Sequence, residues 1–179
     1  MAKLLDALTP DLTTFISKQK IFFVGTAAAE GTVNISPKGT DSFRVINENK
    51  IVWLNLTGSG NETAAHLLKK NRMTIMFCAF EEKPLILRLY GKARIYHPRD
   101  EKFNNYAPLF PKNNGARQII EMELNMVQTS CGYAVPFMDF VEERDILIKW
   151  AEKQGKEKIK RYWEEKNMKS IDGFETKIF

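Results

Sequence analysis

The chain has 179 residues, enough for one domain with a sizeable core and hardly enough for two. Hydrophobic residues make up 44% and charged residues 27%, as in ordinary globular proteins, and no apolar run approaches the roughly 20 residues that cross a bilayer. The formal net charge of +5 favours anionic partners in general, such as nucleic acid or a phosphorylated cofactor.

The N-terminal stretch MAKLLDALTPDLTTF lacks the basic-then-apolar layout of a signal peptide, because acidic residues interrupt it, so we expect a cytoplasmic protein. Cys78 and Cys131 stand in apolar, strand-like surroundings and form no CxxC pair, which predicts two buried free thiols in a reducing compartment. His66 and His97 lack any ligand spacing, so we expect no metal site.

The first expected helix starts with Thr9 as N-cap and Pro10 at the first helical position. Later helices are expected over 61–70, over 98–110, and from about Glu142 to Lys166 with an interruption at Gly155. The β-rich runs predict strands over 20–29, 32–39, 73–80, 85–96 and 117–135, and a hairpin over 43–56.

Hairpin connections favour an antiparallel sheet closed into a barrel over a parallel doubly wound sheet. The sequence therefore predicts a mainly β fold with peripheral helices. We expect one domain over 1–179, with the barrel over about 20–137 and a C-terminal helical segment over about 142–167.

The stretch LTGSGNETAAHLLKKNR (56–72) leads from a strand through a glycine-rich turn into a helix. Unpaired N–H groups at a helix start and the helix dipole favour a phosphate, and glycines let the backbone approach a ligand. The nucleotide signatures GxxxxGK[ST] and GxGxxG are both absent here. The candidate phosphate-binding residues are Thr57, Gly58, Ser59, Gly60, Asn61 and Thr63.

A capping box is the competing interpretation of this turn. Ser59 and Glu62 match S-x-x-E, in which the two side chains satisfy each other's backbone donors. The carboxylate of Glu62 would also repel a phosphate beside it. On the local pattern alone, the capping box is favoured.

The segments NISPKGTDSF (34–43), FCAFEEKPLILRLYGKARIY (77–96) and VQTSCGYAVP (127–136) accompany this turn in order. Together they resemble the pyridoxamine 5'-phosphate oxidase-like family of FMN-binding split barrels, over about residues 20–137. The resemblance implies an antiparallel split β-barrel and a homodimer with FMN bound at the subunit interface.

The resemblance also assigns positions. Lys38 corresponds to a lysine that contacts the flavin, and the Gly58–Thr63 turn corresponds to the segment that receives the FMN phosphate. Gln128, with Thr129 or Ser130, corresponds to a Gln-Ser pair on a later strand that contacts the cofactor. Arg88 lies on the strand beside the flavin, and we infer a cofactor contact for it because a cation there would stabilise reduced flavin.

The sequence departs from the oxidase at two points. The oxidase's Ser-Arg-Lys at the phosphate loop is replaced by Asn61-Glu62-Thr63, so a phosphate must rely on backbone N–H groups, hydroxyls and a cation such as Lys38 or Arg88. Its C-terminal Arg-x-His substrate element has no counterpart. We therefore expect an FMN-dependent oxidoreductase that acts on an unidentified small molecule, with unknown catalytic residues.

Structural alternatives exist for several of these residues. Arg88 also fits an exposed strand position, Trp53 fits the core as well as a ring stacked on flavin, and His66 fits packing or the surface. Asp172 and Gly173 predict a turn.

Two other functions stay open. One is a non-catalytic sensor on the same barrel that binds flavin, a deazaflavin or heme, since no acid–base constellation is visible. The other is a nucleic-acid-binding barrel, supported by the net charge alone. We expect neither nucleic acid nor a membrane as a partner.

Overall fold

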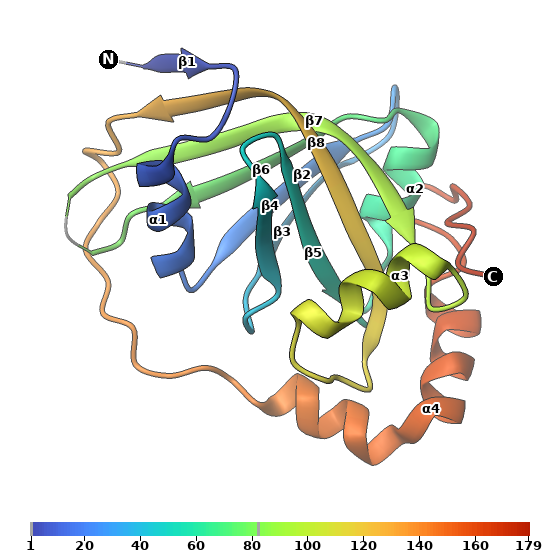
Figure 1. The fold of residues 1–179 in the computed structure, drawn as a ribbon. Coiled ribbons are helices and arrows are strands. Elements are labelled where there is room, and N and C mark those ends of the chain that lie inside the picture. Colours follow the sequence, from blue (N-terminus) through green and yellow to red (C-terminus); the bar gives the residue numbers. More distant parts are fainter. Residues whose placement is uncertain (1, 82) are drawn as a thin grey trace.

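The computed structural model describes residues 2–81 and 83–179. An eight-stranded antiparallel sheet in the order β3-β2-β6-β7-β8-β5-β4, with β1 paired to β8, curls into a split barrel (Figure 1). This confirms the predicted fold class. The strands are β1 (Lys3–Leu5), β2 (Phe22–Ala27), β3 (Val33–Lys38), β4 (Phe43–Asn47), β5 (Lys50–Leu56), β6 (Met73–Cys78), β7 (Ile86–Tyr96) and β8 (Ala116–Ser130).

The helices surround the sheet. They are α1 (Pro10–Lys18), α2 (Glu62–Lys69), α3 (Glu101–Tyr106) with the 3-10 turn η1 (Ala107–Leu109), and α4 (Ile146–Lys166). Figure 1 shows α4, in orange, as two segments outside the sheet that meet at a bend. The bend lies at Gly155, whose φ of 70° is readily adopted only by glycine, so the expected interruption is confirmed.

The start of α1 follows the local sequence. The hydroxyl of Thr9 accepts a hydrogen bond from the backbone N–H of Leu12 at 3.3 Å, and Pro10 occupies the first helical turn. Leu12 and Ile16, one turn apart, are the buried residues of this helix and pack into the main core. Capping and periodicity therefore agree, which is why the sequence located this helix correctly.

Direct cross-strand pairs divide the sheet into an inner and an outer face, because residues opposite each other point to the same side. Phe22 is buried on the inner face, and its partner across β3 is Lys38. The next pair, Phe23 and Pro37, therefore points outward. This alternation decides on which side each candidate site residue lies.

Three expectations about the end of β8 and the segment after it were wrong. The strand ends at Ser130 rather than continuing to residue 135, because Gly132 turns the chain with a φ of 64°. Cys131 therefore lies outside the sheet and is exposed, whereas Cys78 is buried as expected. The following helix begins at Ile146 rather than near Glu142.

Close backbone contact at Gly91 gives a test of the barrel. A Cβ at this position would lie 1.9 Å from the carbonyl oxygen of Glu123 on β8, at a β-bulge between the two strands. Backbone atoms cannot move aside cheaply, so we expect Gly91→Ala to lower the free energy of unfolding by about 3 kcal/mol or more in denaturant titration. Gly25→Ala is the matched control, since its Cβ would make only an ordinary 3.7 Å contact. Equal stability of the two variants would contradict this packing.

Candidate functional site

The turn of residues 57–61 joins β5 to α2, and the end of α4 covers it. The indole N–H of Trp163 donates to the hydroxyl oxygen of Thr57 at 2.8 Å, and that hydroxyl donates to the carbonyl of Gly115 at 2.9 Å. The side-chain amide of Asn167 donates to the carbonyl of Gly58 at 3.1 Å. The Thr57 hydroxyl thus has both a donor and an acceptor within the chain, and it positions the turn.

The capping box expected at this turn is absent. Asn61 is the N-cap residue of α2, no side chain caps the helix, and Ser59 is exposed. The carboxylate of Glu62 instead accepts the backbone N–H of Ile171, at 3.1 and 3.2 Å. The prediction was wrong because a distant segment supplies the partner that the local pattern assigned to Ser59.

The turn retains features that suit a phosphate. A Cβ at Gly58 would meet nothing within 4 Å, so the backbone there borders open space. The first-turn N–H groups of α2 receive no side-chain cap, and such groups are donors for an anion. Thr63, by contrast, is buried, and its hydroxyl already accepts from the Asn34 amide at 3.4 Å.

Lys38 and Arg117 bring positive charge to the inner side of the turn. Lys38 lies half-buried with its ammonium group 5.5 Å from the centre of the Trp53 ring, and Trp53 itself is fully buried in the core. Burial, reinforced by the positive charge of Arg117, lowers the pKa of Lys38 from 10.5 to about 8. Arg117 is 3% exposed and donates to the carbonyl of Gly60 at 2.9 Å.

Sequence reasoning missed Arg117. Burial lowers the pKa of its guanidinium to about 10, which leaves it charged at neutral pH. The sequence shows only that Arg117 is a basic residue at the start of the apolar strand β8. Basic residues at strand ends are ordinarily exposed to solvent, so this pattern does not predict a buried cation. Only the coverage by α4 shows that this arginine is buried.

A second group of candidate residues lies on the outer face. Arg88 pairs with Gln128 across β7 and β8, and its guanidinium donates to the hydroxyl of Ser130 at 3.2 Å. The phenol of Tyr90, which the sequence did not single out, donates to the Gln128 side chain at 2.9 Å. Thr129 pairs with the fully buried Leu87 and so points to the inner face, away from these residues.

An apolar groove of about 650 Å³ adjoins this row, and we call it the outer groove. Val33 and Ile35 are each 71% exposed in it, far more than a barrel core would leave them. Basic and amide side chains, among them Arg72 and Lys92, also line it. Its apolar lining includes Phe23, Val33, Ile35, Met73, Met76, Tyr90 and Met126.

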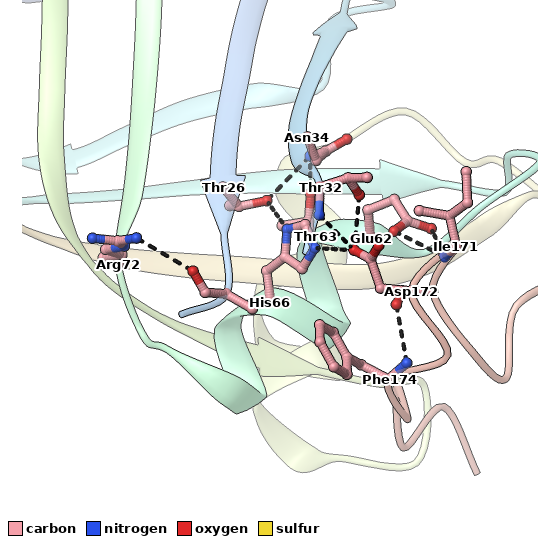
Figure 2. A network of polar contacts seen from close by, with 12 residues as sticks. Thr26, Thr32, Asn34, Glu62, Thr63, His66, Arg72, Ile171, Asp172 and Phe174 are labelled. Carbon is pink, nitrogen blue, oxygen red and sulfur yellow. Dashed lines mark hydrogen bonds and ion pairs between the residues drawn. The ribbon is translucent and has the colours of Figure 1, made fainter. Parts of the chain in front are cut away.

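A polar network ties the C-terminal turn to the barrel (Figure 2). The carboxylate of Asp172 accepts from the backbone N–H and the hydroxyl of Thr32, at 2.9 and 2.8 Å, and these bonds lower its pKa. It lies 4.0 Å from Nε2 of the fully buried His66, whose Nδ1 is 3.2 Å from the Thr26 hydroxyl. Residues 171–172 form the expected turn, and His66 is a packing residue.

Within residues 2–81 and 83–179, no group of three or more His, Cys, Asp or Glu residues could hold a metal ion. The same residues contain no helix that is both long and apolar enough to span a membrane.

A family model described as pyridoxamine 5'-phosphate oxidase matches residues 8–131. The pyridoxamine 5'-phosphate oxidase family protein ustO of Aspergillus flavus is 35% identical over 139 residues, which cover 75% of this chain and 56% of that protein. The chain belongs to the pyridoxamine 5'-phosphate oxidase family. It spans little more than half the length of this relative.

Solved structures agree with this family assignment at the level of the fold. A HupZ variant from group A Streptococcus is 17% identical with a TM-score of 0.55, and covers 68% of this chain and 98% of its own. A Lactobacillus delbrueckii protein named after the oxidase is 14% identical with a TM-score of 0.55, and covers 69% of this chain and 94% of its own. These similarities concern the fold, and about two thirds of this chain takes part in each of them.

The lowered pKa of Lys38 predicts a pH-dependent stability. Because the folded state disfavours the ammonium form, the unfolded chain binds more protons between pH 8 and 10.5, and stability rises with pH across that window. We therefore expect Lys38→Met to be more stable than the wild type at pH 7, by about 2 to 3 kcal/mol, in buffer without phosphate or sulfate. The difference should shrink above pH 8.

Chemical denaturation at pH 7 and pH 10 measures this difference. Lys112→Met removes an exposed lysine and serves as the control, for which the two pH values should give the same small change. A Lys38→Met variant that is less stable than the wild type at pH 7 would contradict the desolvated environment of Lys38.

Proposed function

We propose that this family member binds FMN and acts as an oxidoreductase on a small molecule. The observation that carries the proposal is the outer groove and the row of polar side chains at its end, where Tyr90 bonds to Gln128 and Arg88 bonds to Ser130. Ligand sites typically combine an apolar cavity with a few convergent polar groups.

The residues present fit a flavin. Its ring system has apolar faces, which suit side chains such as Met76 and Met126, and a polar edge of carbonyls and nitrogens, which suits Arg88 and Gln128. The positive charge of Arg88 would stabilise the anionic reduced ring. A bound flavin supplies hydride transfer, while the chain supplies orientation and excludes water.

We further propose a homodimer with the cofactor at the subunit interface. Lys38 and the Gly58–Thr63 turn border the inner face, whereas Arg88 and Gln128 lie on the outer face of the same sheet. One cofactor can contact both groups if a second copy supplies one of them. The exposed Val33 and Ile35 support this arrangement, because an interface would remove them from water.

A non-catalytic heme or deazaflavin carrier is the alternative on the same barrel. Heme needs an axial ligand, and both histidines of the chain are buried and hydrogen-bonded, His66 at 0% and His97 at 6% exposure. This argues against a heme held by histidine. Two free cysteines support a reducing, cytoplasmic location.

The first experiment is reconstitution with FMN followed by gel filtration with light scattering. We expect a dimer that retains about one flavin per subunit. Arg88→Met should weaken FMN binding about 10- to 100-fold, because a charge-assisted hydrogen bond is lost. Arg94→Met, an exposed arginine on the same strand, is the matched control and should leave the dissociation constant unchanged.

Reduction of the bound flavin by NADH or NADPH, with reoxidation over many turnovers, separates an oxidoreductase from a carrier. Flavin that stays oxidised with either donor supports the carrier. A monomer that retains no flavin contradicts the proposed function, and binding to DNA at low salt would then support the nucleic-acid alternative.

A further inference from the structure

Unpartnered polar atoms concentrate at one end of the barrel. In the described part of the chain, five buried side-chain polar atoms lack a hydrogen-bond partner, and four of them belong to β5, to the turn that follows it and to the paired strand β8. They are Trp53 Nε1, Asn55 Oδ1, Asn61 Oδ1 and Arg117 Nε. Buried polar atoms are normally bonded, so such a concentration indicates a polar partner that the described chain does not supply.

Contacts along the chain bring these atoms together. Trp53 and Asn55, two positions apart on β5, both point to the inner face. The side-chain amide of Asn55 donates to Gln118, the neighbour of Arg117 in β8. Asn61 and Arg117 share one partner, because both contact Asn167 at the end of α4. The ammonium group of Lys38 lies over the Trp53 ring and completes the group.

The region holds two positive charges and no acidic partner. In residues 2–81 and 83–179, neither Lys38 nor Arg117 forms an ion pair with a carboxylate. The charge of each cation also lies near enough to affect the other, since Arg117 contributes to the lowered pKa of Lys38. Two neighbouring desolvated cations repel each other and are costly without an anion.

Structural roles account for only part of this arrangement. Nη1 of Arg117 holds the turn and α4 through Gly60 and Asn167, but its Nε bonds to nothing in the described chain. Buried water would satisfy hydrogen bonds at Nε and at the Trp53 indole. Water carries no charge, so it would not offset the two cations.

We propose that Lys38 and Arg117 form a binding site for an oxyanion of the phosphate class, between the inner end of β5 and the 57–61 turn. The two cations and the indole N–H of Trp53 donate to the anion, and a proton or water on it donates to the amide oxygens of Asn55 and Asn61. Half-buried Lys38 leaves an entry from solvent.

Lys38 and Arg117 supply the positive charges that the turn itself lacks. Arg88 lies on the outer face with Ser130, so of the two cations named from the sequence only Lys38 lies on the inner face, near enough to Arg117 for their charges to interact. Arg117 supplies the second positive charge from β8. That the anion is the phosphate of FMN rests on the proposed function. A free phosphate offers the same chemistry.

Thermal unfolding in sodium phosphate, against sodium chloride at equal ionic strength, tests the site without any flavin. At a phosphate concentration about ten times its dissociation constant, we expect the wild-type melting temperature to rise by about 3 to 6 °C. Arg117→Gln and Lys38→Met should each abolish the shift, and Arg117→Lys should restore part of it. If Arg117→Gln fails to fold, Lys38→Met still decides, since the ammonium group of Lys38 makes no hydrogen bond in the described chain.

Arg99→Gln is the matched control. Arg99 also holds the C-terminal chain, through the carbonyls of Lys177 and Ile178, but lies outside the site, so its variant should keep the full phosphate shift. The proposal is overturned if phosphate stabilises the wild type no more than chloride does, or stabilises Lys38→Met equally.

Binding of FMN and riboflavin to the same variants identifies the source of the anion. If Arg117→Lys and Lys38→Met weaken FMN but not riboflavin binding, the site holds the cofactor's phosphate. If Arg117→Gln and Lys38→Met abolish the phosphate shift and leave FMN binding unchanged, the site takes a free oxyanion. A wild type that binds no flavin but keeps the shift refutes the proposed function and supports this site.

Discussion

The guanidinium of Arg117 is the contact on which the arrangement around the turn depends. It reaches from β8 to the carbonyl of Gly60 and to the side chain of Asn167, at 2.9 and 2.7 Å. Three segments far apart in the sequence are thereby joined by one buried cation. Trp163 and Asn167 add bonds to Thr57 and Gly58, so the end of α4 forms part of the wall around the turn.

The alternation of strand residues sets a second constraint. Side chains on β3 and β7 alternate strictly between faces, so Lys38 and Arg88 come to opposite sides of the sheet. The sequence predicts that both residues belong to one cofactor site, but in the folded chain the sheet lies between their side chains. A second copy can reunite the two faces around one ligand, and this gives the exposed apolar outer groove a physical role.

Local sequence signals predicted the parts of the fold that local interactions determine. The cap at Thr9, the hairpin of β4 and β5, and the bend at Gly155 each depend on residues within a few positions. The capping box failed because Glu62 bonds to Ile171, more than a hundred residues away. The burial of Arg117 could not be predicted from the local sequence either, because it depends on how α4 docks and not on the strand that carries the arginine.

The same distant docking explains how the family's loop can lose its cations and still suit an anion. A cation on the turn itself would be solvated, and its charge would be screened by salt. Arg117 instead reaches the turn from β8 and is buried, so little water competes for its guanidinium. The repulsion between Lys38 and Arg117 then opposes folding of the free chain and is relieved when an anion enters. Because Asn167 and the anion would share one guanidinium, occupancy of the site and docking of α4 should be thermodynamically coupled, each stabilising the other.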